Sequence, residues 1–171
     1  MTLEGSCQCG KVTFRCESAT PYPYMVCYCS ICRKLQGAVA CNVMGVRDTL
    51  RVTGKSRLKK YHAVMRELRK RPTRSPGERW FCGDCGTHLY VIDDRWPEGV
   101  WPNAAALDTE LPTPPENVHI MLDFKPRWVP TPGSGPRFAV YPELSIADWH
   151  AKHGLTTTVR TKRKARRPRA R

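Results

Sequence analysis

The 171-residue sequence lacks any long hydrophobic run. No segment approaches the roughly 18 consecutive apolar residues that a membrane span requires. The start, Met-Thr-Leu-Glu-Gly-Ser, also lacks the basic segment followed by an apolar stretch that marks a secretory signal. The sequence therefore predicts neither a membrane span nor export, and we expect a cytoplasmic protein, whose thiols stay reduced.

Aromatic residues are also sparse, at 9% of the chain, whereas there are 15 prolines and 12 glycines. This composition is more typical of a loop-rich, mainly β protein than of a helical bundle. The length fits about one domain with a substantial core. Many short apolar segments between turn signals favour a β-sandwich-like arrangement with few and short helices.

Acidic residues are scarce as well, with 15 Asp and Glu against 29 Lys and Arg. Residues 160–171 hold eight basic residues and no acidic one, so outside this segment 21 basic residues face 15 acidic ones. Such a block of like charge cannot collapse, and we expect a domain over residues 1–155 and a disordered basic tail over 156–171. The tail is either a solvated extension or an electrostatic arm for nucleic acid.

Turn residues and apolar patterns locate the expected elements. A short helix at 31–36 would be capped by Ser30 and ended by Gly37. A later helix over 145–153 would be capped at its start by Ser145 and ended by Gly154. Basic, proline-bearing residues 66–79 read as an exposed excursion. Residues 80–81 and 89–92 would form a hairpin around a cysteine pair. Further strands are expected at 10–16, 38–43, 50–53, 59–63 and 118–124.

The cysteines are unevenly distributed along the chain. Seven of the nine form three tight clusters. Reduced, clustered cysteines are typical of metal ligands. A closed zinc site takes four ligands, and a catalytic one takes three and keeps a position open. The two pairs and one triplet therefore suggest one structural and one catalytic Zn²⁺ per chain. The pairs are Cys7-Gln-Cys9 and Cys82-Gly-Asp-Cys85, and the triplet is Cys27-Tyr-Cys29-Ser-Ile-Cys32.

The triplet has its own chemical character. Cys32 falls in the first turn of the expected helix, where the helix dipole and the following Arg33 and Lys34 should favour a thiolate. No histidine or carboxylate lies within five residues to add a fourth ligand. The alternative is a second structural zinc completed by a distant residue. His88, close behind the second pair, either faces this open position or is a hydrogen-bonded structural histidine. Cys16 and Cys41 are expected to be buried, inert thiols.

Three segments also resemble a known family. Residues 6–12 (Ser-Cys-Gln-Cys-Gly-Lys-Val), 27–34 (Cys-Tyr-Cys-Ser-Ile-Cys-Arg-Lys) and 81–89 (Phe-Cys-Gly-Asp-Cys-Gly-Thr-His-Leu) are similar to motifs of the glutathione-dependent formaldehyde-activating enzyme family. The resemblance covers about residues 3–155. It implies a β-rich fold with two zinc–sulfur centres, related to the methionine-R-sulfoxide reductases.

The resemblance further implies a carbon–sulfur lyase that joins glutathione, or another small thiol, to formaldehyde or a related aldehyde. Arg33 and Lys34 are candidates to bind the carboxylates of glutathione, or else are solvated surface cations. The competing interpretation is a non-enzymatic zinc module whose tail binds a polyanion. By resemblance, the structural zinc ligands are Cys7, Cys9, Cys82 and Cys85, and the catalytic ones are Cys27, Cys29 and Cys32.

Overall fold

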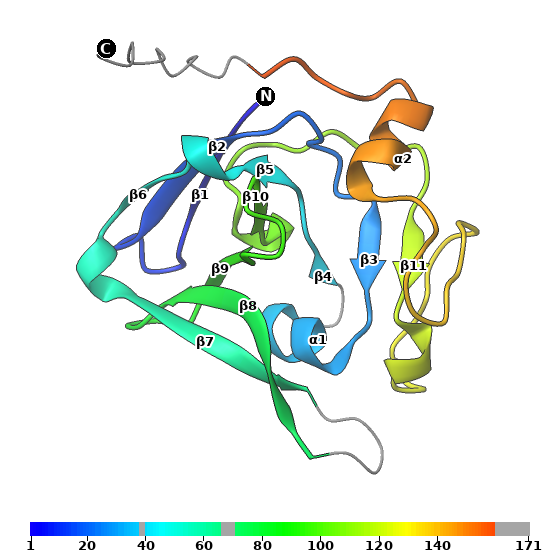
Figure 1. Cartoon of the computed structure of the whole chain (residues 1–171), viewed down its shortest axis with the longest axis horizontal. Helices are drawn as coiled ribbons and strands as arrows, with labels where there is room; N and C mark the ends of the chain where they lie inside the picture. The colour runs from blue at the N-terminus through cyan, green and yellow to red at the C-terminus, as the bar shows by residue number, and fades with distance from the viewer. Residues whose placement is uncertain (38–39, 66–70, 160–171) are drawn as a thin grey trace, which may run out of the picture.

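The computed structural model describes residues 1–37, 40–65 and 71–159, and over these ranges the chain is mainly β, as expected (Figure 1). The strands form three sheets instead of two simple layers. The first sheet has the order β1 (Thr2–Ser6), β2 (Thr13–Glu17), β6 (Arg51–Thr53). The second has the order β5 (Gly45–Val46), β10 (Gly99–Pro102), β9 (His88–Ile92), β8 (Thr73–Cys82), β7 (Leu58–Met65). The third has the order β11 (Val118–Ile120), β3 (Met25–Cys27), β4 (Ala40–Cys41).

The main core lies between the first two sheets. Along β2, Phe14 and Cys16 are buried while Thr13 and Arg15 are exposed, because successive strand residues point to opposite faces. Phe14 meets Tyr90 of β9 edge-on, with ring centroids 5.5 Å apart. This packing fixes β1 and β2, and the turn between them, against the β8–β9 hairpin.

A second core joins the third sheet to the late helix α2 (Ile146–Lys152). Tyr24, just before β3, stacks on Trp149 with ring centroids 3.7 Å apart. Ser145 caps α2 by accepting a hydrogen bond from the Asp148 backbone N–H, as the sequence predicts. The stacked rings hold β3, which leads directly into the cysteine triplet.

The prediction that residues 66–79 form an exposed excursion is wrong for the second half of this range. From Thr73 the chain is already in β8, which pairs antiparallel with β7, and Ser75 and Gly77 are buried. Pro76, which suggests a loop, lies where the register with β7 shifts, and such an irregularity tolerates a residue without an N–H. Residues 66–70 lie outside the described residues.

Other strands also begin or end at different residues than the sequence predicts. The strand predicted at 118–124 ends at Ile120, because Met121 adopts a positive φ of 62° and a 3₁₀ turn (Leu122–Phe124) follows. The strand predicted at 38–43 is reduced to β4, and 38–39 lie outside the described residues. Of the expected tail, Thr157 donates its N–H to the Ala19 carbonyl, while residues 160–171 lie outside the described part.

No helix among the described residues is both long and apolar enough to cross a membrane. The relationship to methionine-R-sulfoxide reductases that the resemblance implies stays a prediction.

Candidate metal centres

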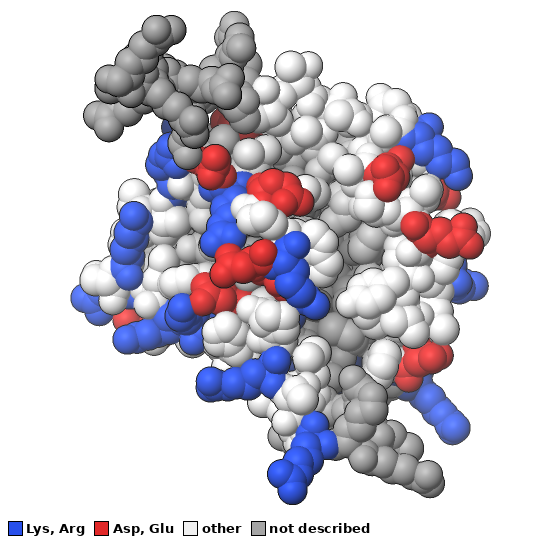
Figure 2. Space-filling model, in the orientation of Figure 1, with Lys and Arg blue, Asp and Glu red and all other residues white. Residues whose placement is uncertain are grey.

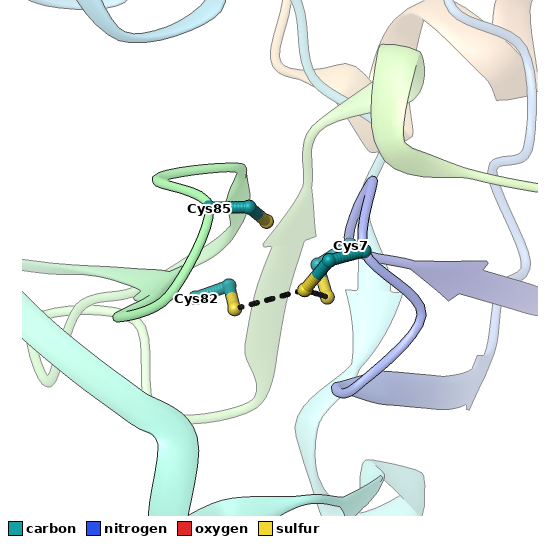
Figure 3. A group of neighbouring side chains, drawn as sticks. Cys7, Cys82 and Cys85 are labelled. Atoms are coloured by element: carbon teal, nitrogen blue, oxygen red, sulfur yellow. Dashed lines mark hydrogen bonds between the residues drawn. The ribbon is translucent and has the colours of Figure 1, made fainter.

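The four paired cysteines converge at one place (Figure 3). Cys7 and Cys9 lie in the turn between β1 and β2, Cys82 ends β8, and Cys85 lies in the turn that leads to β9. All four Sγ atoms lie within 4.8 Å of one another. The Cys7 and Cys9 sulfurs are 3.5 Å apart, and those of Cys9 and Cys82 are 3.8 Å apart.

Local hydrogen bonds shape both turns. Gly10 donates its N–H to the Cys7 carbonyl, and Gly86 donates to the Cys82 carbonyl. Both glycines have positive φ, 71° and 76°, which a residue with a Cβ rarely adopts. Across the gap, Lys11 pairs with Asp84 at 2.8 Å, which joins the two turns outside the sulfur cluster.

The donor set fits zinc. A tetrahedral ion with Zn–S bonds of about 2.3 Å separates its sulfurs by about 3.8 Å, which matches the Cys9–Cys82 sulfur distance of 3.8 Å. The Val12 N–H donates to the Cys7 sulfur at 3.2 Å. Hydrogen bonds from the Thr87 side chain and backbone lower the pKa of Cys85 to about 5. Such bonds favour the thiolate form that a metal requires.

The triplet also converges, at a separate place. Cys27 ends β3, Cys29 caps α1 (Ser30–Gln36), and Cys32 lies in its first turn. Their Sγ atoms lie within 4.8 Å of one another, and in the described ranges no further cysteine, histidine or carboxylate joins them. The structure thus separates the seven cysteines into four and three, and both clusters could hold a metal ion such as zinc.

The helix begins differently from the prediction. Cys29, not Ser30, is the N-cap, and its sulfur accepts the Cys32 N–H at 3.3 Å. Hydrogen bonds from Cys27, from Cys32 and from backbone N–H groups lower the pKa of Cys29 strongly. The pKa of Cys32 is raised instead: its hydrogen bond with Cys27 lowers it, but its hydrogen bond with Cys29 and its burial together raise it more. Without a bound metal, the hydrogen bonds of the triplet thus favour the thiolate at Cys29 and not at Cys32, where the sequence predicts it.

Polar side chains from several elements surround the triplet. Arg33 of α1 is partly buried, and its Nε has no hydrogen-bond partner among the described residues, whereas Lys34 is exposed. Arg79 of β8 lies near enough for its charge to act on Cys32. Tyr141 is 71% exposed, so solvent limits the effect of burial on it, but it lies near enough for the charge of Cys27 to raise its pKa. Sequence reasoning gave neither Arg79 nor Tyr141 a role near the triplet, because their distance from it along the chain hides this proximity.

His88 does not behave as a hydrogen-bonded structural histidine. It is 3% exposed, and neither ring nitrogen has a partner in the part of the chain that the structure describes. Burial, and then the charge of Arg79, lower its pKa to about 4. Of the two isolated cysteines, Cys16 is buried as expected, whereas Cys41 is only partly buried. Burial raises the pKa of Cys16 to about 12 and that of Cys41 to about 11.

Fold and sites together define a mainly β protein with two separate thiolate centres, one of four cysteines and one of three. Comparison with known proteins narrows this class. The profile described as "Glutathione-dependent formaldehyde-activating enzyme" matches residues 2–123, and the chain belongs to this family.

Two relatives illustrate the match. A curated protein of Halomonas elongata, provisionally named a glutathione-dependent formaldehyde-activating enzyme, is 50% identical over 159 residues, which are 91% of this chain and 98% of that protein. A crystal structure of a Rhodobacter sphaeroides protein from a structural-genomics programme is 29% identical. The match covers 64% of this chain and 91% of that one, with a TM-score of 0.49.

Proposed function

We propose that this protein is a zinc-dependent carbon–sulfur lyase that joins glutathione and formaldehyde, reversibly, into S-hydroxymethylglutathione. The family and the named relative support glutathione and formaldehyde as substrates. The observation that carries the proposal is the cluster of three cysteines, Cys27, Cys29 and Cys32, without a fourth protein ligand in the described ranges. Because reduced thiols are needed at both clusters, we place the activity in the cytoplasm.

The two cysteine clusters would have different roles. Cys7, Cys9, Cys82 and Cys85 would hold a structural zinc, and the triplet would hold the catalytic one. When bound at the triplet, zinc supplies the chemistry of a Lewis acid that favours the thiolate form of an incoming thiol. The chain itself lowers the pKa of Cys29 and keeps Cys27 buried, which prepares the site for a cation.

Arg33 is the better of the two candidates for recognising glutathione. It follows Cys32 directly, and its Nε is buried without a partner among the described residues. A guanidinium can hold a carboxylate with two parallel hydrogen bonds, which an ammonium cannot. Lys34, being exposed, contributes only charge. We therefore assign Arg33 to a carboxylate of glutathione and give Lys34 a minor role.

The non-enzymatic alternative, a zinc module that binds nucleic acid, rests on residues 160–171, which lie outside the described residues. On the face shown in Figure 2, acidic side chains lie among the basic ones. Several basic side chains of the described body are paired, as in Arg57 with Asp84 at 3.1 Å and Arg47 with Asp94 at 2.7 Å. The described body therefore offers no uninterrupted basic surface on this face, and the enzymatic interpretation is favoured.

The test is the rate of adduct formation. The zinc-loaded full chain, mixed with glutathione and formaldehyde, should form S-hydroxymethylglutathione faster than the spontaneous reaction. Mercaptoethanol, which lacks carboxylates, should react more slowly on the protein. If the rate with glutathione never exceeds the spontaneous one, the proposed function is wrong.

A further inference from the structure

Tyr28, the residue between two cysteines of the triplet, points away from their sulfurs. Successive side chains of an extended chain point to opposite faces, and the backbone at Cys29 is extended. Cys27 and Cys29 therefore share one face, and Tyr28 takes the other. The packing agrees, because the three cysteines lie in the core beside α2, whereas Tyr28 packs with Val26 and Val129. Tyr28 thus supports the triplet from behind, with its side chain fully buried.

Behind the triplet, a buried hydrogen bond joins Tyr28 to another strand. The Tyr28 hydroxyl lies 3.0 Å from Nδ1 of His119 in β11, and His119 is 0% exposed. The two rings are tilted by 38°, with their centroids 5.8 Å apart. Removing one partner of such a bond leaves the other buried and unsatisfied, which costs more than the bond itself contributes. The contact therefore holds the phenol ring, and with it the backbone that joins Cys27 to Cys29.

His119 is itself placed by backbone hydrogen bonds on both sides of β11. On one side, β11 runs parallel to β3, with Ile120 opposite Cys27 (Figure 1). On the other side, His119 donates its N–H to the Pro136 carbonyl and accepts the Phe138 N–H at its own carbonyl, both at 2.8 Å. Because both edges of the strand are bonded, His119 gives Tyr28 a fixed anchor.

The position of this backbone matters for a metal ion. The three Sγ atoms of the triplet lie within 4.8 Å of one another, and a zinc ion with Zn–S bonds of about 2.3 Å needs its sulfurs about 3.8 Å apart. Cys27 and Cys29 flank Tyr28 directly, so a shift of the Tyr28 backbone changes the distance between their sulfurs. Groups that orient the ligands of a metal typically change its affinity by about 10–100-fold when they are altered.

We propose that Tyr28 and His119 are positioning residues of the triplet, and that their hydrogen bond sets the spacing at which the sulfurs of Cys27 and Cys29 meet a metal ion. The inference rests on one part of the proposed function, namely that the triplet binds zinc. It adds two residues that act through the cysteines and not on the substrate.

Tyr28→Phe is the decisive variant, because it removes the hydroxyl and keeps the ring. Its triplet should bind Co²⁺ and Zn²⁺ about tenfold more weakly than that of the wild type, while the affinity of the four-cysteine cluster stays unchanged. Competition with a chelator measures both affinities on the full chain. The absorption of Co²⁺ distinguishes the two centres, with Cys32→Ser to identify the triplet bands.

Tyr24→Phe is the matched control. Tyr24 lies on the same segment and is equally buried, but its hydroxyl has no hydrogen-bond partner among the described residues. This variant should bind both metal ions as the wild type does. A purely structural role of Tyr28 would lower the melting temperature of Tyr28→Phe and leave the triplet affinity unchanged. That result, or an equal loss of affinity in Tyr24→Phe, would overturn the proposal.

A double-mutant cycle tests whether the two residues act as a pair. His119→Leu should weaken the triplet about as much as Tyr28→Phe, and the double variant should bind no more weakly than either single one, because both changes break the same bond. His119→Asn, which keeps a polar atom near the place of Nδ1, should retain more affinity than His119→Leu. Additive losses in the folded variants would refute the pair. If the His119 variants do not fold, Tyr28→Phe and its control still decide.

Failure of this inference can be told from failure of the proposed function, because metal affinity is measured without glutathione or aldehyde. If the wild-type triplet binds no metal ion, both are wrong. If it binds zinc and wild-type protein accelerates adduct formation, but Tyr28→Phe binds zinc equally well, the proposed function stands and only the role of Tyr28 and His119 is wrong.

Discussion

The two cysteine clusters are built from similar donors but in opposite ways. The four-cysteine cluster joins the β1–β2 turn to the β8–β9 turn, and Cys9 and Cys85 are exposed. The triplet takes all its sulfurs from six consecutive residues, and Cys27 is buried. A metal at the first cluster must therefore hold distant parts of the chain together. At the second it constrains little beyond one short helix.

The largest difference should appear in stability. Because the four-cysteine cluster joins distant segments, a metal held there would contribute directly to folding, as structural zinc does by about 10–16 kcal/mol in small domains. Cys82→Ser should abolish the cooperative thermal transition, whereas Cys32→Ser should unfold within a few degrees of the wild type. Circular dichroism melts measure both, with Cys41→Ser as a control outside the clusters. Equal collapse of both variants would contradict the division between a structural and a catalytic site.

Catalysis should show the reverse pattern. Cys32→Ser should lower the enzymatic rate of adduct formation by at least about 100-fold, to the spontaneous background, because the triplet no longer holds its metal. The variant should contain about one zinc per chain instead of two. Cys41→Ser, also a single sulfur-to-oxygen change, should keep full activity. Full activity in folded Cys32→Ser would show that the reaction does not take place at the triplet.

A smaller effect is expected on glutathione binding, where Arg33 and Lys34 should contribute unequally. Arg33→Gln should raise KM for glutathione about tenfold, since one charge-assisted hydrogen bond is lost. Lys34→Gln should change KM less than about twofold, because an exposed charge is screened by solvent. Steady-state kinetics with glutathione and with mercaptoethanol measure both, and the mercaptoethanol reaction should respond to neither change. Equal effects of the two variants would assign them a merely electrostatic role.

The smallest predicted effect lies outside both clusters, at Asp93. Arg95 binds this carboxylate through Nε at 3.0 Å and Nη2 at 2.7 Å, and its hydrogen bonds lower the pKa of Asp93. A lowered pKa contributes stability above the unfolded value of about 3.9, and this stability is lost as the pH falls through the folded value.

Asp93→Asn should therefore cost about 1 kcal/mol at neutral pH, and this difference should shrink below pH 4. Urea unfolding at several pH values measures it. A variant that stays equally destabilised in acid would show that the side chain acts through packing and not through its charge.

The sequence predicted the features that depend on local pattern. The spacing of the cysteines predicted the four-plus-three grouping, and turn residues predicted the β8–β9 hairpin and the cap at Ser145. The prediction for 73–79 is wrong because of long-range pairing. These basic, proline-bearing residues form a strand by hydrogen bonding to β7. The environments of His88 and Arg79 also depend on which elements meet in space, and no local pattern encodes that.

The central claim is that the triplet, and not the four-cysteine cluster, receives the substrate thiol. Replacement of both zinc ions by Co²⁺ makes each thiolate centre visible by absorption, and Cys32→Ser identifies the bands of the triplet by their loss. Titration with glutathione should change the triplet bands and leave those of the four-cysteine centre unchanged. If glutathione leaves the triplet bands untouched, or perturbs the four-cysteine bands instead, the account is contradicted.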